Sequence, residues 1–284
     1  SSGDCTPAVL SPNRGENSLL LLERQGISRL HIDVAFPVLH GQNGEDGTLQ
    51  GLLELAGIPV AGCGTLASAL SMDKDRAHKL VGLEGILVPH SLILERGTPL
   101  DRADAFADEI GYPLFVKPVK AGSSYGVTKV TQASQLSDAI ALAFKYDTQV
   151  ILEENIEGFE VGCAVLGNQE LTVGEVDEIE LSSGFFDFTE KYTLKTSAIH
   201  VPARIAPEKA AEIKETAKRI YLALGCRGFA RVDMFLTPEG KIVFNEANTI
   251  PGFTSHSRYP GMMKAAGHSF GEILTRIIEL AFEE

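Results

Sequence analysis

The sequence predicts a mixed α/β protein of the α+β kind, built from three units over residues 1–74, 75–160 and 161–284. In the first unit, strand-like and helical segments alternate through glycine-rich loops, a pattern typical of parallel strands. In the second unit, strands flank a glycine-rich hairpin. In the third, two successive strands form a hairpin that carries acidic residues. A chain of 284 residues that is 44% hydrophobic is long enough for two or three domains with real cores.

The first unit is predicted to contain two strands and two helices. A buried strand, a glycine-rich loop, a helix, a short strand and a second helix are expected in this order over 31–39, 40–47, 48–56, 58–60 and 65–82. Residues 1–17 are polar and rich in turn residues, and they lack the apolar stretch of a signal peptide. Since the chain begins with Ser1 and not with Met, we expect it to start inside its gene.

The second and third units alternate between strands and amphipathic helices. Strands are expected over 88–94, 113–118, 128–130, 149–154, 161–166, 171–176, 231–235 and 241–244. Helices are expected over 102–110, 134–144, 207–224 and 269–282. The stretch 181–195 shows weak periodicity and is predicted to be a long loop, which inside a compact domain is more often functional than not.

Composition excludes several classes of function. A net charge of −13 argues against nucleic-acid binding, because a phosphate backbone requires a basic surface. Four scattered cysteines without a CxxC pair argue against a zinc site and indicate a reducing compartment, so we expect a cytoplasmic protein. The sequence contains no apolar run of membrane-spanning length, so no membrane partner is expected.

The hairpin near the end of the chain predicts a metal site. Asp233 lies on its first strand, and Glu246 and Asn248 lie on its second. Two carboxylates and one amide are the oxygen ligands that Mg²⁺ accepts, usually together with substrate phosphates. Arg231, two residues before Asp233, lies on the same face of its strand and could stabilise a transferring phosphoryl group. The alternative is a solvated acidic hairpin.

A second candidate site is the glycine-rich loop after the strand that ends in Lys117. Its residues Gly122, Ser123, Ser124 and Gly126 would let backbone N–H groups approach a phosphate, and Lys117 would add positive charge. The loop is not a Walker A motif, because no Gly-Lys-Ser/Thr follows at the required spacing. An ordinary hairpin turn is the alternative.

Three further features leave two interpretations open. Acidic residues between Glu153 and Glu160 could accept hydrogen bonds from a ribose, or they could end a strand in solvent. His40, in a glycine-rich loop after a strand, could be functional or structural. Lys74 is a lone basic residue on an apolar helix, which by itself predicts little.

The chain resembles the ATP-grasp superfamily and, within it, the D-alanine–D-alanine ligase family. The resemblance runs from about His31 to the end and includes six motifs: His40-Gly41-x-x-Gly44-Glu45-Asp46-Gly47, Met72-Asp73-Lys74, Val116-Lys117-Pro118, Gly122-Ser123-Ser124, Arg231-x-Asp233 and Asn245-Glu246-x-Asn248-Thr249-x-Pro251-Gly252. It implies an ATP-grasp fold behind an N-terminal α/β domain similar to that of biotin carboxylase. The opening Gly-Gly-x-Ser-x-Glu-type loop of the family has no match in residues 1–30, so the first strand of that domain is expected to be missing.

The resemblance also implies a role for each matching residue. ATP would be held by Lys74, Lys117, Ser123, Ser124, Glu153, Glu154, Ile156 and Glu160. Two Mg²⁺ ions, or Mn²⁺, would bind Asp233, Glu246 and Asn248, while Arg231 and the Gly252 amide would stabilise the tetrahedral intermediate. Ser123, Lys191 and Tyr192 would belong to the segments that close over the site. A homodimer is common in this family.

Two positions are similar to the VanG-type D-alanine–D-serine ligases of vancomycin resistance. Phe186 and Arg258 stand where the D-alanine–D-alanine ligases usually carry Tyr and an apolar residue. The resemblance implies that D-alanine is phosphorylated and then joined to D-serine. The substrate site would be lined by Arg258, Phe186, Asp177, Ser257 and His40. A surface ion pair is the alternative role for Arg258. A D-alanine–D-alanine ligase and a truncated, inactive nucleotide-binding domain are the alternative functions.

Overall fold

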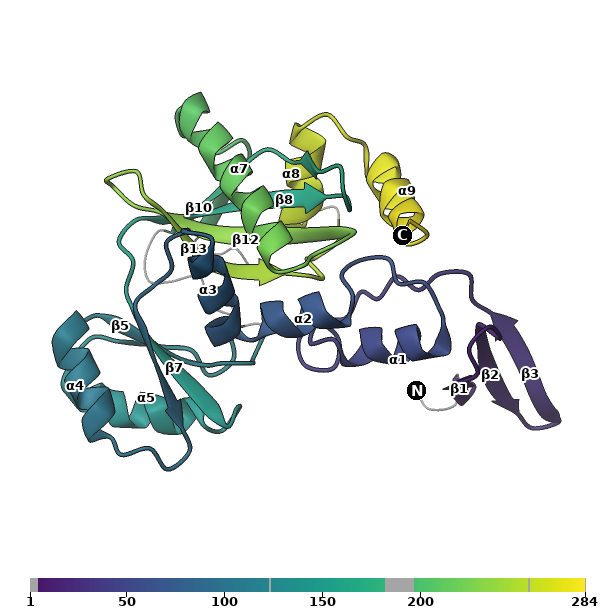
Figure 1. The fold of residues 1–284 in the computed structure, drawn as a ribbon, viewed down its shortest axis with the longest axis horizontal. Helices are drawn as coiled ribbons and strands as arrows, with labels where there is room; N and C mark the ends of the chain where they lie inside the picture. Colours follow the sequence, from purple (N-terminus) through teal and green to yellow (C-terminus); the bar gives the residue numbers. More distant parts are fainter. Residues whose placement is uncertain (1–4, 123, 182–196, 255, 284) are drawn as a thin grey trace.

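The computed structural model describes residues 5–122, 124–181, 197–254 and 256–283. Within them, three antiparallel sheets follow one another along the chain, and helices pack against the second and third sheets (Figure 1). The predicted mixed α/β class is confirmed.

The first sheet is a small antiparallel one, formed by β1 (Ala8–Leu10), β2 (Ser18–Glu23) and β3 (Gly26–His31). A two-residue turn joins β2 to β3, and so short a connection permits only antiparallel pairing. This sheet precedes the segments 31–39 and 58–60, which we expected to form parallel strands. Those two segments do meet in parallel, but among the described residues only through one isolated bridge between Ala35 and Val60, with Ala35 N donating to Pro59 O at 2.9 Å.

The apolar run over 31–39 is only partly buried, with Val38 and Leu39 exposed, and it is not the buried strand that we predicted. Val34 and Phe36 pack against the core beneath the C-terminal helices, whereas Ile32 and Ala35 pack on the neighbouring core of the first helix. The side chains are thus shared between two cores without a ladder of backbone hydrogen bonds. Pro37, which has no N–H group, removes one donor that such a ladder would need.

Three helices follow: α1 (Thr48–Ala56), α2 (Thr65–Met72) and α3 (Lys74–Leu83). The single helix predicted over 65–82 is interrupted at Asp73, whose backbone is extended and whose carboxylate accepts a hydrogen bond from Arg76 N at 3.1 Å. Asp73 therefore caps α3. The break brings Lys74 to the first turn of α3, where its Nζ donates to Ala121 O at 3.1 Å.

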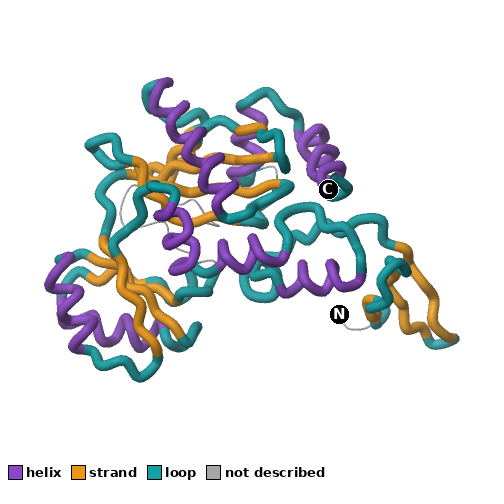
Figure 2. Tube along the Cα trace, in the orientation of Figure 1, coloured by secondary structure: helices purple, strands orange, loops and turns teal. Residues whose placement is uncertain are grey.

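The second sheet has the order β4-β7-β5-β6 and lies at the lower left of Figure 1. Its strands are β4 (Ser91–Glu95), β5 (Leu114–Pro118), β6 (Thr128–Val130) and β7 (Gln149–Glu154). Helices α4 (Asp101–Ile110) and α5 (Leu136–Ala143), the latter after a 3₁₀ turn at Ala133–Gln135, cover one face, as Figure 2 shows. The other face is left for a ligand cavity.

The third sheet has six strands, in the order β11-β10-β8-β12-β13 with β9 also paired to β8. The strands are β8 (Phe159–Leu166), β9 (Thr172–Val173), β10 (Asp177–Leu181), β11 (Ser197–His200), β12 (Phe229–Leu236) and β13 (Ile242–Asn248). Three helices accompany them: α7 (Pro207–Ala223), α8 (Arg258–Ala265) and α9 (Phe270–Leu280). Among the described residues, none of the helices has the length and apolarity that a bilayer crossing requires.

The two faces of the third sheet are covered differently. On one face, the apolar side chains of β8 and β12 join those of α3 and α7 in the largest core. On the opposite face, α8 and α9 cover only one end, where Ala164, Leu166 and Phe229 pack with Tyr259 and Met262. Strand alternation leaves the polar side chains of β8, β12 and β13 on the uncovered part of this second face.

We predict that Tyr221→Phe destabilises the third sheet. The buried hydroxyl of Tyr221 donates to Gly167 O at 2.8 Å, so the change leaves this buried carbonyl oxygen without that donor. A fall of about 1–2 kcal/mol in the free energy of unfolding is expected in urea titrations. The exposed Tyr146 provides the control variant Tyr146→Phe, and equal effects of the two variants would contradict the prediction.

Candidate active site

The third sheet places four positions in one row across four strands. Asp177 on β10 is opposite Gly162 on β8, Gly162 is opposite Asp233 on β12, and Asp233 is opposite Glu246 on β13. Residues directly opposite one another in a sheet share a face, so three carboxylates point to the same side of it. The next row places Arg231 opposite Asn248. The structure thus brings together the oxygen donors that the sequence predicted to converge.

Asp233 is the most heavily bonded member of this row. Arg231 donates to it from Nε at 2.8 Å and from Nη2 at 2.6 Å, and Asn248 Nδ2 donates at 2.9 Å. The carboxylate is only 1% exposed. Burial alone would lower the pKa of Arg231, but the charge of Asp233 outweighs it and the pKa is raised. Arg231 therefore keeps its positive charge beside the row.

The donor set at this edge of the sheet fits a hard divalent cation. Asp233, Glu246 and Asn248 offer only oxygen ligands, which suit Mg²⁺ and Mn²⁺. The described residues contain no group of three His, Cys, Asp or Glu side chains able to hold a metal. If Mg²⁺ binds here, the amide oxygen of Asn248 would be the third protein ligand beside the two carboxylates, and substrate phosphates would be expected to add further oxygen ligands.

Arg258, the first residue of α8, forms a buried ion-pair network. Its Nε and Nη2 donate to Asp177 at 2.7 and 2.8 Å, and its Nη1 donates to Glu160 at 2.8 Å. Nη2 also lies 3.4 Å from Asp233 Oδ1. Although burial opposes its charge, Asp177 and Asp233 raise the pKa of Arg258. A surface ion pair, the alternative role for Arg258, is therefore wrong, because the pair is buried.

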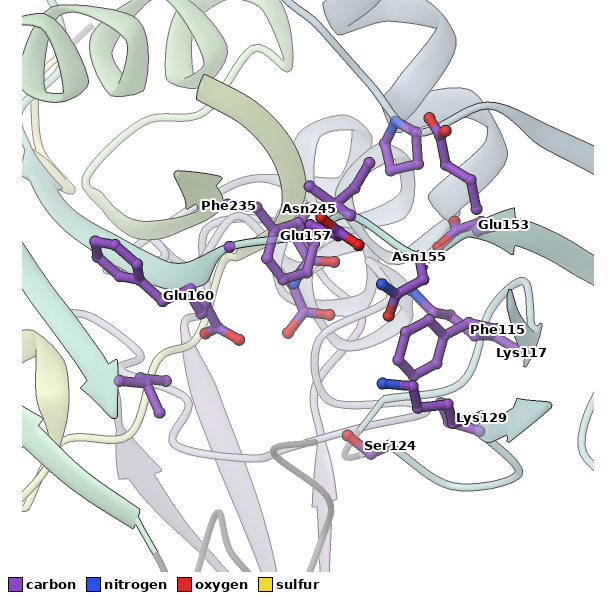
Figure 3. A pocket seen from close by; sticks show the side chains of 18 of the residues that line it. Phe115, Lys117, Ser124, Lys129, Glu153, Asn155, Glu157, Glu160, Phe235 and Asn245 are labelled. Atoms are coloured by element: carbon purple, nitrogen blue, oxygen red, sulfur yellow. Dashed lines mark hydrogen bonds and ion pairs between the residues drawn. The ribbon is translucent and has the colours of Figure 1, made fainter. Parts of the chain in front are cut away.

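A cavity of about 580 Å³ lies between the second and third sheets (Figure 3). This volume is within the range of small-molecule and cofactor sites. Its lining includes every described residue that the sequence assigned to ATP, namely Lys74, Lys117, Ser124, Glu153, Glu154, Ile156 and Glu160. Sequence reasoning missed Lys129, which is paired with Phe115 across β5 and β6 and lies 5.7 Å above its ring. Because Lys129 is paired with Phe115, it lies on the same face of the sheet as Phe115 and Lys117, and this strand position was its only signal in the sequence.

Lys117 and Glu153 belong to a buried polar chain that the sequence did not predict. Lys117 Nζ donates to Glu153 Oε2, and His78 Nδ1 lies 3.6 Å from Glu153 Oε1. His78 Nε2 is in turn 2.9 Å from the backbone oxygen of Asn245. Burial opposes ionisation of Glu153, but Lys117 and His78 outweigh it and lower the pKa of this carboxyl. This series of polar contacts links the second sheet to β13, the strand that carries Glu246.

A second cavity of about 420 Å³ adjoins the first. Its lining includes predicted residues of the acceptor side and the oxyanion site, namely His40, Arg231, Glu246, Asn248, Gly252, Ser257 and Arg258. Lys74, Ala121 and Glu246 line both cavities. The two cavities therefore meet beside these three residues.

Loop residues shape the second cavity. Ser257 Oγ accepts a hydrogen bond from Thr254 N at 2.9 Å and crowds Gly252, where a Cβ would lie 2.9 Å from it. His40 Nδ1 lies 4.0 Å from Glu45, and this carboxylate raises the pKa of His40. Glu45 also accepts from the Gly41 backbone. The His40 loop is thus held by its own acidic residue.

Four of the predicted site residues lie outside the described residues. They are Ser123, Phe186, Lys191 and Tyr192. Asp177 is described, but it does not line either cavity, since it is fully buried as the bidentate partner of Arg258.

We predict that Glu153→Gln destabilises the protein most at neutral pH. The pKa of Glu153 is below 4.5 in the folded state, so its contribution is present above pH 4.5 and is lost as the pH falls through the folded-state pKa. Removing one partner of the buried Lys117 pair should cost about 3–5 kcal/mol at pH 7. Urea unfolding at several pH values measures this difference.

Glu157→Gln is the matched control, because it makes the same chemical change at an exposed glutamate. A difference between wild type and Glu153→Gln that stays constant or widens below pH 4.5 would contradict this assignment.

Comparison with known proteins identifies the family. The family model "D-ala D-ala ligase N-terminus" matches residues 6–63, and "D-ala D-ala ligase C-terminus" matches residues 81–279. The likeness therefore starts well before His31, where we expected it to begin. The vancomycin B-type resistance protein VanB of Enterococcus faecalis is 47% identical, with 99% of this chain and 82% of that protein covered.

Two further relatives agree with this result. A D-alanine–D-alanine ligase of Caldicellulosiruptor bescii is 45% identical, over 97% of this chain and 77% of that protein. The crystal structure of the VanG D-Ala:D-Ser ligase from Enterococcus faecalis is 60% identical and superimposes with a TM-score of 0.90, covering 99% of this chain and 81% of that one. Both family models and these relatives agree, and the chain, with its carboxylate row and its two adjoining cavities, belongs to the D-alanine–D-alanine ligase family.

Proposed function

We propose that this chain is an ATP- and Mg²⁺-dependent ligase that joins D-alanine to D-serine through a D-alanyl phosphate. The observation that carries the proposal is the pair of adjoining cavities that share Lys74 and Glu246. Such an arrangement suits phosphoryl transfer from a nucleotide in one cavity to a carboxylate in the other. The product would enter modified peptidoglycan precursors in the cytoplasm, in the manner of a vancomycin-resistance ligase, and the active form would be a homodimer.

In this reaction, the residues of the chain bind, orient and neutralise charge. Lys74 and Lys117 hold the nucleotide phosphates, and Asp233, Glu246 and Asn248 hold Mg²⁺, which when bound neutralises charge on the phosphoryl oxygens. The D-alanine carboxylate attacks the γ-phosphorus of ATP, which breaks the bond to ADP and gives D-alanyl phosphate. The neutral amine of the acceptor then attacks the carbonyl carbon of this acyl phosphate, and phosphate leaves as the amine gives up a proton. Arg231 and the Gly252 amide stabilise the negative oxygen that forms.

The choice of D-serine rests on two arguments. Arg258 lines the second cavity, where its guanidinium can bond a serine hydroxyl directly or through water. The relative with a solved structure that is 60% identical is a D-Ala:D-Ser ligase. Phe186, Lys191, Tyr192 and Ser123 keep the roles that the family resemblance gives them as part of this proposal.

A D-alanine–D-alanine ligase is the second candidate. Arg258 already donates to Asp177 and Glu160, so its function in this family could be to hold the sheet together and not to select the acceptor. An inactive nucleotide-binding protein is the third candidate.

We predict that the kcat/KM for D-serine as acceptor exceeds that for D-alanine at least about tenfold, the discrimination that one hydrogen bond to a charged group provides. ADP and phosphate release are measured with D-alanine as first substrate and D-serine, D-alanine or D-lactate as the acceptor. Equal or better use of D-alanine contradicts the D-serine assignment and supports the second candidate. Nucleotide binding without turnover by any acceptor supports the third.

We also predict that replacing Arg258 shifts the preference toward D-alanine. Arg258→Leu alone would leave the fully buried Asp177 without its partner, so the variant is made together with Asp177→Asn. The D-serine to D-alanine ratio of kcat/KM should fall about 10- to 100-fold relative to Asp177→Asn alone. An unchanged ratio would rule out the selective role of Arg258.

A further inference from the structure

Gly162 is the one position of the four-residue row that has no side chain. Its neighbours in register are Asp177 and Asp233, and Glu246 lies beyond Asp233. The place above Gly162 is taken by the guanidinium of Arg258, whose Nη2 is 2.8 Å from Asp177 Oδ1 and 3.4 Å from Asp233 Oδ1. The arginine reaches this place from the first turn of α8.

A side chain at position 162 would collide with this ion pair. A Cβ built on Gly162 would come closer than 3.0 Å to Arg258 Nη2, and it would lie 2.6 Å from Asp177 Oδ1. It would also lie 2.9 Å from Met262 Cε. Real Cβ atoms essentially never come within 3.0 Å of such neighbours, so at least one partner must move.

The backbone at Gly162 does not itself require a glycine. Its φ lies outside the left-handed region in which glycine is favoured, and the residue is in the interior of an eight-residue strand. Glycine weakens a strand interior and often marks a site where another group approaches closely. The group that approaches here is the Arg258 guanidinium, so the absence of a side chain is explained by that contact.

The row also needs the arginine in this position. Asp177 and Asp233 flank Gly162 on the two neighbouring strands, and like charges on one face of a sheet destabilise it. The guanidinium lies between the two carboxylates and also bonds Glu160 from Nη1. Moving it away from Gly162 would break the bidentate contact with Asp177 and withdraw charge from Asp233, the predicted metal ligand.

We infer that Gly162 is a positioning residue that seats the Arg258 guanidinium between Asp177 and Asp233, and that it thereby determines how well the ligase selects its acceptor. The seating of Arg258 stands on the geometry alone, whereas the acceptor selectivity rests on the proposed function.

The test is a double-mutant cycle on the full chain. Gly162→Ala is made in the wild type and in the Asp177→Asn/Arg258→Leu background, in which the guanidinium is gone. In the wild type it should lower the thermal unfolding midpoint by on the order of 5 °C and raise the KM for the acceptor about tenfold, while the KM for ATP stays within about twofold. In the second background only the contacts with the side chain at 177 and with Met262 Cε remain, so the changes in the unfolding midpoint and in the acceptor KM should both be clearly smaller.

Gly271→Ala is the matched control, since a Cβ there meets nothing within 4 Å. Equal shifts from Gly162→Ala in both backgrounds would overturn the inference, because independent sites are additive. If Gly162→Ala fails to fold in the wild type but folds in the second background, the coupling is confirmed. The unfolding midpoint can depend on both positions while the D-serine to D-alanine ratio of kcat/KM is changed by neither Gly162→Ala nor the loss of Arg258. In that case Gly162 still seats Arg258, and the proposed D-serine role of Arg258 fails.

Discussion

The Arg258 guanidinium holds together strands that its absence would drive apart. Asp177, Asp233 and Glu160 come from three adjacent strands of the third sheet, and all three carboxylates face this one cation from within 3.4 Å. Several buried negative charges on one sheet face are tolerated only when a buried positive charge compensates them. Because Arg258 begins α8, the same contact also fixes that helix and the loop before it, which lines the second cavity.

A second buried network connects the two sheets across the first cavity. Glu153 on β7 binds Lys117 on β5, and His78 on α3 lies between Glu153 and the backbone oxygen of Asn245 on β13. Asn245 is the residue before Glu246, so the lysine expected to hold phosphate and the expected metal ligand are connected through buried groups. Relative movement of the two sheets would break contacts between buried polar groups, which are costly to leave unpaired.

The motifs along the chain predicted many of the charged residues that line the two cavities. Lys74, Lys117, Glu153, Glu246 and Arg258 were all assigned from local patterns and family resemblance, and the structure brings them to adjoining surfaces. Their partners could not be predicted in this way. His78 is a single histidine on a helix, and Lys129 is a single lysine on a short strand; neither forms a pattern until distant strands pair.

By itself, the sequence determined most helices and strands of the second and third sheets, the family and the chemistry of the donors, because helix and strand periods and motif spacings are local properties. Only the tertiary structure decided what each charge does. Arg258 is in a buried network rather than at the surface, the apolar run over 31–39 is divided between two cores, and Gly162 leaves room for a guanidinium. These outcomes depend on strand register and on the approach of segments distant along the chain, which no local pattern records.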